Sequence, residues 1–213
     1  MEFSVFKDKI AKIEKLELPG EQFHLKMAPI ERLLELKKKA RQAKTARKAA
    51  VMVLFYPSIE SKTRFVLILR KTYKGVHSAQ VGFPGGKWEE GDTDFEATAL
   101  RETHEEVGVH PQSVRVLKQL TEIYIPPSNF FVQPYLGFTH EYPTFVPQEK
   151  EVEAIIEVPL ERFMEDAVKI SKTITTSYAK DIQVPAFLLG GHVVWGATAM
   201  MLNEVREILK KLL

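Results

Sequence analysis

The amino-acid sequence predicts an α/β fold in which short strands alternate with a few amphipathic helices. Strongly apolar, β-branched runs recur, the clearest at 49–56 and 64–70, and a polar turn separates these two. Segments with helical periodicity lie before, among and after the apolar runs. With 213 residues, of which 45% are hydrophobic, the chain can bury a substantial core. We therefore expect one main domain over 49–213 and a helical extension over 1–48.

The N-terminal extension is predicted to contain two helices. Apolar residues recur at helical spacing over 3–16, and Pro19 with the glycine after it ends that element. A second helix is expected from Pro29, since proline suits the first turn of a helix. The basic run at 37–48 has two interpretations. It is either a solvated helix face followed by a tether, or a segment whose last residues help to neutralise an anionic substrate.

The main domain is predicted to begin with paired strands and to end with a helix. Helical periodicity marks 95–107, with Asp92 or Thr93 as its N-cap and Gly108 as its C-cap. The segment 71–86, before this helix, is expected to be a loop. Further strands are expected at 114–125, 130–138 and 151–158 and at two or three places within 167–195, with helical segments at 159–164 and 196–213.

Composition and charge exclude several classes of protein. The chain has no cysteine, so a disulfide framework, thiolate catalysis and a zinc–thiolate site are impossible. A net charge of +2 is too small to indicate a nucleic-acid or membrane-surface partner. No apolar run approaches the roughly 18 residues that span a bilayer, and the acidic N-terminus is unlike a signal peptide. We therefore expect a cytoplasmic protein that binds neither nucleic acids nor membranes.

An acidic cluster on the predicted helix 95–107 indicates a metal site. Glu102, Glu105 and Glu106 are spaced so that one helix face presents all three carboxylates. Like charges at this spacing destabilise a helix unless something neutralises them. A solvated acidic stripe is the alternative, but Arg101 precedes the cluster and apolar neighbours imply that the helix packs on one side. Carboxylate oxygens are ligands that Mg²⁺ prefers.

Three glycines lie shortly before this helix. Gly82, Gly85 and Gly86 cluster around Pro84. Because glycine has no Cβ, such a segment can turn sharply and approach a phosphate or a metal ion closely. A simple turn between two elements would need only one glycine, so the cluster favours a functional role.

The run from these glycines to Val109 reads GG-x5-D-x8-RE-T-x-EE-V-G-V and resembles the Nudix box. Nudix enzymes hydrolyse nucleoside diphosphates linked to another moiety, and the resemblance implies an α/β/α sandwich with a mixed sheet. It also implies a bound Mg²⁺ or Mn²⁺ ion. By resemblance, the expected roles are Glu102 and Glu106 as principal metal ligands, Glu105 as a third ligand or the base, Arg101 as the residue that orients a carboxylate, and the backbone carbonyl of Gly85 as a further ligand.

Three departures from the usual box resemble the branch of the family that cleaves coenzyme A. Asp92 stands where the box usually has glutamate. The spacer from it to Arg101 is one residue longer than usual, and Thr103 occupies a position where an aliphatic residue is commoner.

The segment before the glycines also resembles the coenzyme A branch in part. Arg70, His77, Gln80 and the FPGG run at 83–86 match its upstream motif, whereas other positions differ. Coenzyme A carries a 3′-phosphate besides its pyrophosphate, so basic side chains near the site would pair with it. A merely solvated basic loop is the alternative. The predicted substrate-binding residues are Arg70, Lys71, Lys74, His77 and Gln80.

Hydrolysis also needs a carboxylate that accepts a proton from the attacking water. The candidates are Glu105, Glu149, Glu151 and Glu153. Glu105 comes first because it lies on the metal face of the helix, and Glu149 and Glu151 come second. We expect the chain to hydrolyse coenzyme A or its derivatives to adenosine 3′,5′-bisphosphate and 4′-phosphopantetheine. The alternatives are the same reaction on another nucleoside diphosphate derivative, such as ADP-ribose, and a Nudix module that binds a nucleotide without hydrolysing it. The family and the amphipathic N-terminal helix also favour a homodimer.

Overall fold

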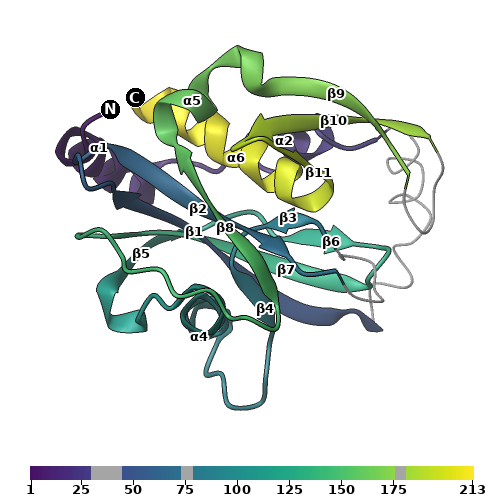
Figure 1. Ribbon diagram of the computed structural model, residues 1–213, viewed down its shortest axis with the longest axis horizontal. Coiled ribbons are helices and arrows are strands. Elements are labelled where there is room, and N and C mark those ends of the chain that lie inside the picture. Colours follow the sequence, from purple (N-terminus) through teal and green to yellow (C-terminus); the bar gives the residue numbers. More distant parts are fainter. Residues whose placement is uncertain (30–44, 73–78, 176–180) are drawn as a thin grey trace.

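The computed structural model of the protein describes residues 1–29, 45–72, 79–175 and 181–213. Its centre is a mixed sheet of eight strands within these ranges. Helix α4 (Phe95–Val107) covers one face of the sheet, and helices α1 (Phe3–Ile10) and α6 (Gly196–Leu212) cover the other (Figure 1). The α/β/α sandwich predicted from the sequence is therefore confirmed.

The central sheet has the strand order β3-β2-β1-β7-β5, with β4 paired to β1, β6 to β7 and β8 to β2. Strand β1 runs parallel to β7 and antiparallel to β2, which makes the sheet mixed. The strands are β1 (Arg47–Pro57), β2 (Thr63–Arg70), β3 (Val81–Gly82), β4 (Gly85–Lys87), β5 (Val114–Gln119), β6 (Ile123–Ile125), β7 (Phe130–Thr139) and β8 (Val152–Pro159).

A second, three-stranded sheet and several short helices complete the described part of the chain. The sheet has the order β11-β10-β9 and consists of β9 (Lys169–Ile174), β10 (Ile182–Leu189) and β11 (His192–Trp195). The short helices are η1 (Ala11–Lys15), α2 (Glu21–Leu25), η3 (Pro111–Ser113), α5 (Leu160–Met164) and η4 (Asp166–Val168). No helix of the described ranges has the length and apolarity needed to cross a membrane.

Strand β1 separates two apolar cores because successive side chains of a strand point to opposite faces. Val53 and Phe55 belong to the larger core, with α1 and α6. Met52 and Leu54 belong to the smaller core, under α4. This alternation explains why a continuous apolar run forms a central strand that is covered on both faces.

The predicted N-terminal helix is confirmed as α1 followed by η1. Phe6, Ile10 and Ile13 are fully buried in the larger core, so this segment packs directly onto the main domain. The helix predicted from Pro29 lies outside the described residues beyond Pro29 itself. Strand β1 begins at Arg47, slightly before the expected boundary.

Helix α4 has the predicted bounds and the predicted C-cap, but its N-cap differs. Gly108 takes the left-handed conformation, with φ of 79°, that glycine tolerates at this position. The N-cap is Asp94, whose side chain accepts a hydrogen bond from the backbone N–H of Ala97 at 2.8 Å. The prediction of Asp92 or Thr93 was wrong because Asp92 is held by a side chain further along the chain, as described below.

Two other local predictions were wrong in detail. The segment 71–86 was expected to be a loop, yet it contains β3 and the start of β4, which pair with β2 and β1. These strands are too short to show a periodicity in the sequence. The expected strand at 114–125 is divided into β5 and β6, which both pair with β7.

Candidate active site

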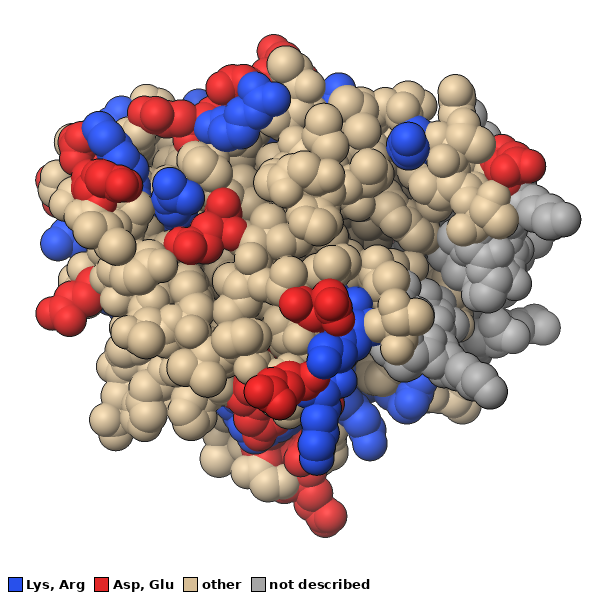
Figure 2. All heavy atoms as spheres, in the orientation of Figure 1, with Lys and Arg blue, Asp and Glu red and all other residues tan. Residues whose placement is uncertain are grey.

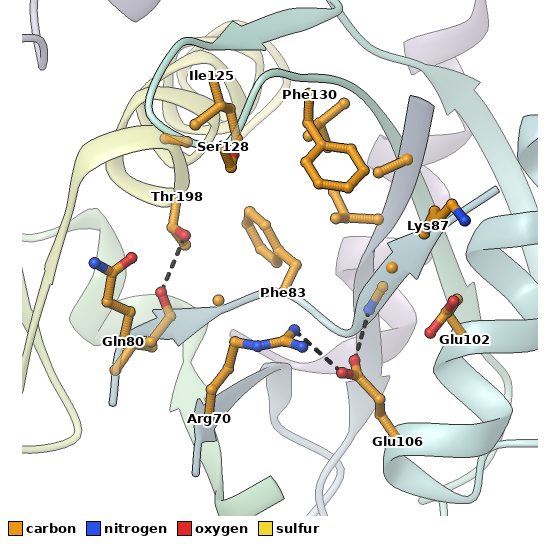
Figure 3. Close-up of a pocket in the computed structure, with 18 of the residues that line it drawn as sticks. Arg70, Gln80, Phe83, Lys87, Glu102, Glu106, Ile125, Ser128, Phe130 and Thr198 are labelled. Carbon is orange, nitrogen blue, oxygen red and sulfur yellow. Dashed lines mark hydrogen bonds and ion pairs between the residues drawn. The ribbon is translucent and has the colours of Figure 1, made fainter. Parts of the chain in front are cut away.

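A cavity of about 460 Å³ is lined by residues from both α4 and α6, the helices on the two faces of the sheet. Its walls come from the N-terminal half of β1, from β3 and β4, from α4, from the start of β7 and from the start of α6. Figure 3 shows Glu106 reaching from α4 to Arg70, while Phe83, Phe130 and Ile125 line other parts of the same cavity. Figure 2 shows acidic and basic side chains gathered together over the region of α4 and β4.

Glu106 is the most buried acid of the cavity, with a side chain 1% exposed. Its carboxylate accepts a hydrogen bond from the backbone N–H of Gly85 at 2.8 Å and another from Arg70 at 3.2 Å. Burial raises the pKa of Glu106 to about 7, although Arg70 and Gly85 oppose the rise, and Glu102 and Glu151 add to it. Glu106 is therefore a carboxylate fixed in position and surrounded by further acids.

The two glycines of β4 let carboxylates from α4 reach this cavity. Gly85 has φ of 150°, and a Cβ there would lie 2.4 Å from the carbonyl oxygen of Ala50. A Cβ on Gly86 would lie 2.4 Å from the carboxyl carbon of Glu102. Gly85 thus permits a close contact with the backbone of β1, and Gly86 leaves room for the carboxylate of Glu102.

Arg101 connects the loop between β4 and α4 to the carboxylates on the surface of α4. It donates to Asp92 at 2.8 and 2.9 Å, to the carbonyl of Lys87 at 3.0 Å, and to Glu102 and Glu105 at 3.1 Å each. The hydrogen bond from Arg101 lowers the pKa of Asp92 to about 2. Arg101 is therefore placed beside three carboxylates, and its role in orienting them stays a prediction.

Glu151 joins the cavity from the segment before β8. Its carboxylate lies 3.7 Å from Arg70, on the side of that guanidinium away from the closer contact with Glu106. Among the described residues the cavity wall includes Glu105 and Glu151 but neither Glu149 nor Glu153. The geometry therefore favours Glu151 over Glu149 as the second candidate base.

The other predicted substrate-binding residues have different outcomes. Arg70 and Gln80 both line the cavity. The described cavity wall does not include Lys71, whose backbone N–H donates to the carbonyl of Glu151 at 2.8 Å. Lys74 and His77 lie outside the described residues.

Two polar residues that sequence reasoning missed also line the cavity. The side-chain oxygens of Ser128 and Gln148 are buried without a hydrogen-bond partner in the described structure. The backbone N–H of Gln148 donates to the carbonyl of Glu106 at 3.0 Å, which ties this segment to α4. Neither residue belongs to a charged or periodic pattern, so only the three-dimensional arrangement singles them out.

A model of the NUDIX domain matches residues 45–177 of the sequence, well over half of the chain. The chain belongs to the Nudix hydrolase family. It is 32% identical over 167 residues to Nudix hydrolase 22, chloroplastic, of Arabidopsis thaliana, a match that covers 76% of this chain and 55% of the relative.

Two further similarities concern this Nudix chain. It is 42% identical over 98 residues to the peroxisomal coenzyme A diphosphatase NUDT7 of Mus musculus, covering 46% of this chain and 41% of that protein. The chain thus spans about half the length of these relatives. The crystal structure of the Nudix hydrolase RenU from M. smegmatis superimposes with a TM-score of 0.55 at 16% identity, covering 79% of this chain and 88% of that one, and supports the fold alone.

The Nudix helix α4 carries the donors that a divalent ion prefers, but arginines hold them. As the side chains lie, the described residues contain no group of three His, Asp or Glu side chains close enough to hold a metal. Glu102 and Glu105 are turned to Arg101, and Glu106 to Arg70. Carboxylates that line one cavity nevertheless have suitable chemistry, because Mg²⁺ and Mn²⁺ favour oxygen ligands and retain several waters. Of Gly85, the structure shows the amide bound to Glu106, and a role for its carbonyl stays a prediction.

The raised pKa of Glu106 predicts a pH-dependent gain in stability on substitution. With a pKa of about 7, against 4.5 for an ordinary glutamate, the folded chain binds this proton more tightly than the unfolded chain does. The carboxylate therefore lowers the free energy of unfolding by up to about 3 kcal/mol above pH 7, and the effect vanishes as pH falls to about 4.5. With a chelator present to remove metal ions, Glu106→Gln is expected to raise Tm by several degrees at pH 8 and by little at pH 5. Scanning calorimetry at both values measures this, and a lower Tm at pH 8 would contradict it.

Proposed function

We propose that the chain hydrolyses the pyrophosphate bond of coenzyme A or its derivatives with Mg²⁺ or Mn²⁺ as cofactor. The products would be adenosine 3′,5′-bisphosphate and 4′-phosphopantetheine. The observation that carries the proposal is that Arg70 and Gln80, from the upstream motif, line the same cavity as Glu102 and Glu106 from the Nudix box. The similarity to the mouse coenzyme A diphosphatase supports the choice of substrate.

In this proposal the carboxylates of α4 hold the ion, and Arg70 breaks its ion pair with Glu106 to bind the substrate. Glu102 and Glu106 would be the principal ligands, with Glu105 as the third candidate. When bound, a divalent ion activates water and stabilises the charge that develops on phosphate oxygens. Arg70 lies 3.2 Å from Glu106 and can turn its guanidinium to the pyrophosphate, a planar match for phosphate oxygens.

Two carboxylates compete for the role of base. Glu105 is 47% exposed and lies 3.1 Å from Arg101, whereas Glu151 is 51% exposed and lies 3.7 Å from Arg70. Both line the cavity and both can approach a water molecule without losing a buried contact. Arg101, which contacts Glu105 and Glu102, would keep Glu105 directed along the helix face.

A substrate panel tests the proposal. With Mg²⁺, kcat/KM for coenzyme A is expected to exceed that for ADP-ribose by at least about tenfold, since a site built to pair with an anionic group discriminates against ligands that lack it. A chelator should abolish turnover of both. Equal or faster cleavage of ADP-ribose would favour the alternative substrate class, and binding of nucleotides without any turnover would favour a sensing module.

The assembly and the location of the protein stay predictions. A homodimer is proposed from the family resemblance, and a cytoplasmic location from the composition of the sequence, which contains no cysteine. Of the relatives named above, the Arabidopsis thaliana protein is described as chloroplastic and the Mus musculus protein as peroxisomal.

A further inference from the structure

The cavity has two chemically different ends. The catalytic end contains the charged side chains of α4 together with Arg70 and Glu151. The other end, here named the apolar end, is walled by uncharged side chains from β6, β7, α6 and the segments beside them. Its lining is formed by Phe83, Ile125, Pro127, Phe130, Val132 and Met201.

The strand register places the two ends at opposite sides of the cavity. Lys87 of β4 pairs with Ala49 of β1, Ala49 pairs with Val132 of β7, and Val132 pairs with Ile123 of β6. With neighbouring strands about 4.8 Å apart, β4 and β6 are separated by about 14 Å. A substrate whose pyrophosphate lies against α4 therefore extends one of its two arms across the sheet into the apolar end.

The apolar end is unsuited to an anionic arm. The basic residues of the described cavity wall are Arg70 and Lys87, and both belong to the catalytic end. Arg47 lies near the apolar end, but its guanidinium donates to the carbonyl of Ser128 at 3.0 Å and stacks on the ring of Phe130 at 4.1 Å. The described wall of the apolar end has no cationic side chain of its own, so a phosphate bound among these apolar groups would be desolvated without a charged partner in that wall, which is strongly unfavourable.

A neutral arm with amide groups fits the same surface. The Ser128 hydroxyl is buried and has no hydrogen-bond partner among the described residues, so rotating it about χ1 to meet an amide breaks no hydrogen bond seen in that part of the chain. Thr198, at the start of α6, is already bound to the carbonyl of Val81 at 3.0 Å and holds that wall in place. The apolar surface around Ser128 can cover the methyl and methylene groups of such an arm.

We infer that the apolar end binds the neutral pantetheine arm of the substrate and that Ser128 donates or accepts a hydrogen bond with one of its amides. This inference rests on the proposed function. It assigns the adenosine 3′-phosphate to the opposite side of the pyrophosphate, where Arg70 lies. Ser128 and the walls around it then determine which arms the enzyme accepts.

Two variants test the inference through binding of the two halves of coenzyme A. Ser128→Ala removes the free hydroxyl, and Ala197→Leu fills the cavity from a partly exposed position on α6. With Mg²⁺, calorimetry is expected to show Kd for 4′-phosphopantetheine raised about fivefold by the first and at least tenfold by the second. Kd for adenosine 3′,5′-bisphosphate should stay within twofold in both variants. Ser171→Ala, an exposed serine on β9, is the matched control and should change neither value.

The outcomes separate this inference from the proposed function. Weaker binding of adenosine 3′,5′-bisphosphate, with 4′-phosphopantetheine unaffected, would overturn the inference because the nucleoside would then occupy the apolar end. Failure of the unaltered protein to bind 4′-phosphopantetheine would also overturn it. Because neither product is turned over, these results do not depend on catalysis. If the protein binds 4′-phosphopantetheine through Ser128 but does not cleave coenzyme A, the inferred subsite is supported and the proposed function is refuted.

Discussion

Glu106→Gln is expected to lose about 100- to 1,000-fold in kcat for coenzyme A while the protein stays folded. The donors Gly85 and Arg70 bind different oxygens of Glu106, at 2.8 and 3.2 Å, so the single amide oxygen of glutamine can accept from one of them. Glutamine lacks the negative charge that a divalent ion requires, so charge stabilisation in the transition state is lost. Steady-state kinetics with Mg²⁺, with circular dichroism as the check on folding, measures the effect.

The control for this variant is a second glutamate substitution outside the cavity. Glu153 is exposed on β8 and is not part of the described cavity wall, so Glu153→Gln should keep kcat within about twofold. If Glu106→Gln retained full activity, Glu106 would not be a metal ligand. If the same variant has the higher Tm expected at pH 8, its loss of activity is not caused by a loss of stability.

Gly86→Ala is expected to reduce kcat/KM about 100-fold through the carboxylate of Glu102. A Cβ on Gly86 would lie 2.4 Å from the carboxyl carbon of Glu102 and 2.4 to 2.5 Å from its oxygens. Because the end of a glutamate side chain is flexible, it can move away at a small cost in stability. The displacement moves a proposed metal ligand by more than a catalytic site tolerates.

Gly91 provides the matched control for this prediction. It lies in the loop between β4 and α4, and a Cβ there would meet no atom of the described residues within 4 Å. Gly91→Ala should therefore keep activity within about twofold, and both variants should unfold within about 2 °C of the unaltered protein, because neither substitution disturbs the core. Full activity of Gly86→Ala would show that Glu102 does not need its present position.

Local pattern was sufficient to predict the elements that position the site. The helix at 95–107 has apolar and acidic residues at helical spacing and a glycine after its last turn, and the structure has these bounds. Strands β1 and β2 have long apolar runs because both of their faces are covered. Such features depend on residues that are neighbours in sequence or on one helix turn.

Contacts between distant residues account for what the sequence did not reveal. Asp92 was expected to cap α4, but Arg101, nine residues later, takes it as a partner, and Asp94 caps the helix instead. Arg70 was expected to bind substrate, and no local pattern indicates that it lies between Glu106 and Glu151. The sheet brings these three side chains together, so their arrangement follows from topology and not from spacing.

The apolar end of the cavity could not be predicted at all. Its wall combines Phe83, Phe130 and Met201, which come from three separate segments and resemble ordinary core residues in sequence. Ser128 follows two prolines, which indicates only a turn. Its significance comes from a buried hydroxyl that has no partner among the described residues, and only the three-dimensional structure reveals that.

The measurement that tests the central proposal most directly is the analysis of products formed from coenzyme A with Mg²⁺ in ¹⁸O-labelled water. We predict adenosine 3′,5′-bisphosphate and 4′-phosphopantetheine in equal amounts, with one ¹⁸O atom incorporated into the phosphate of one of them. The labelled product would also identify the phosphorus that the water attacks. Intact coenzyme A after prolonged incubation, or cleavage at any bond other than the pyrophosphate, would contradict the proposal.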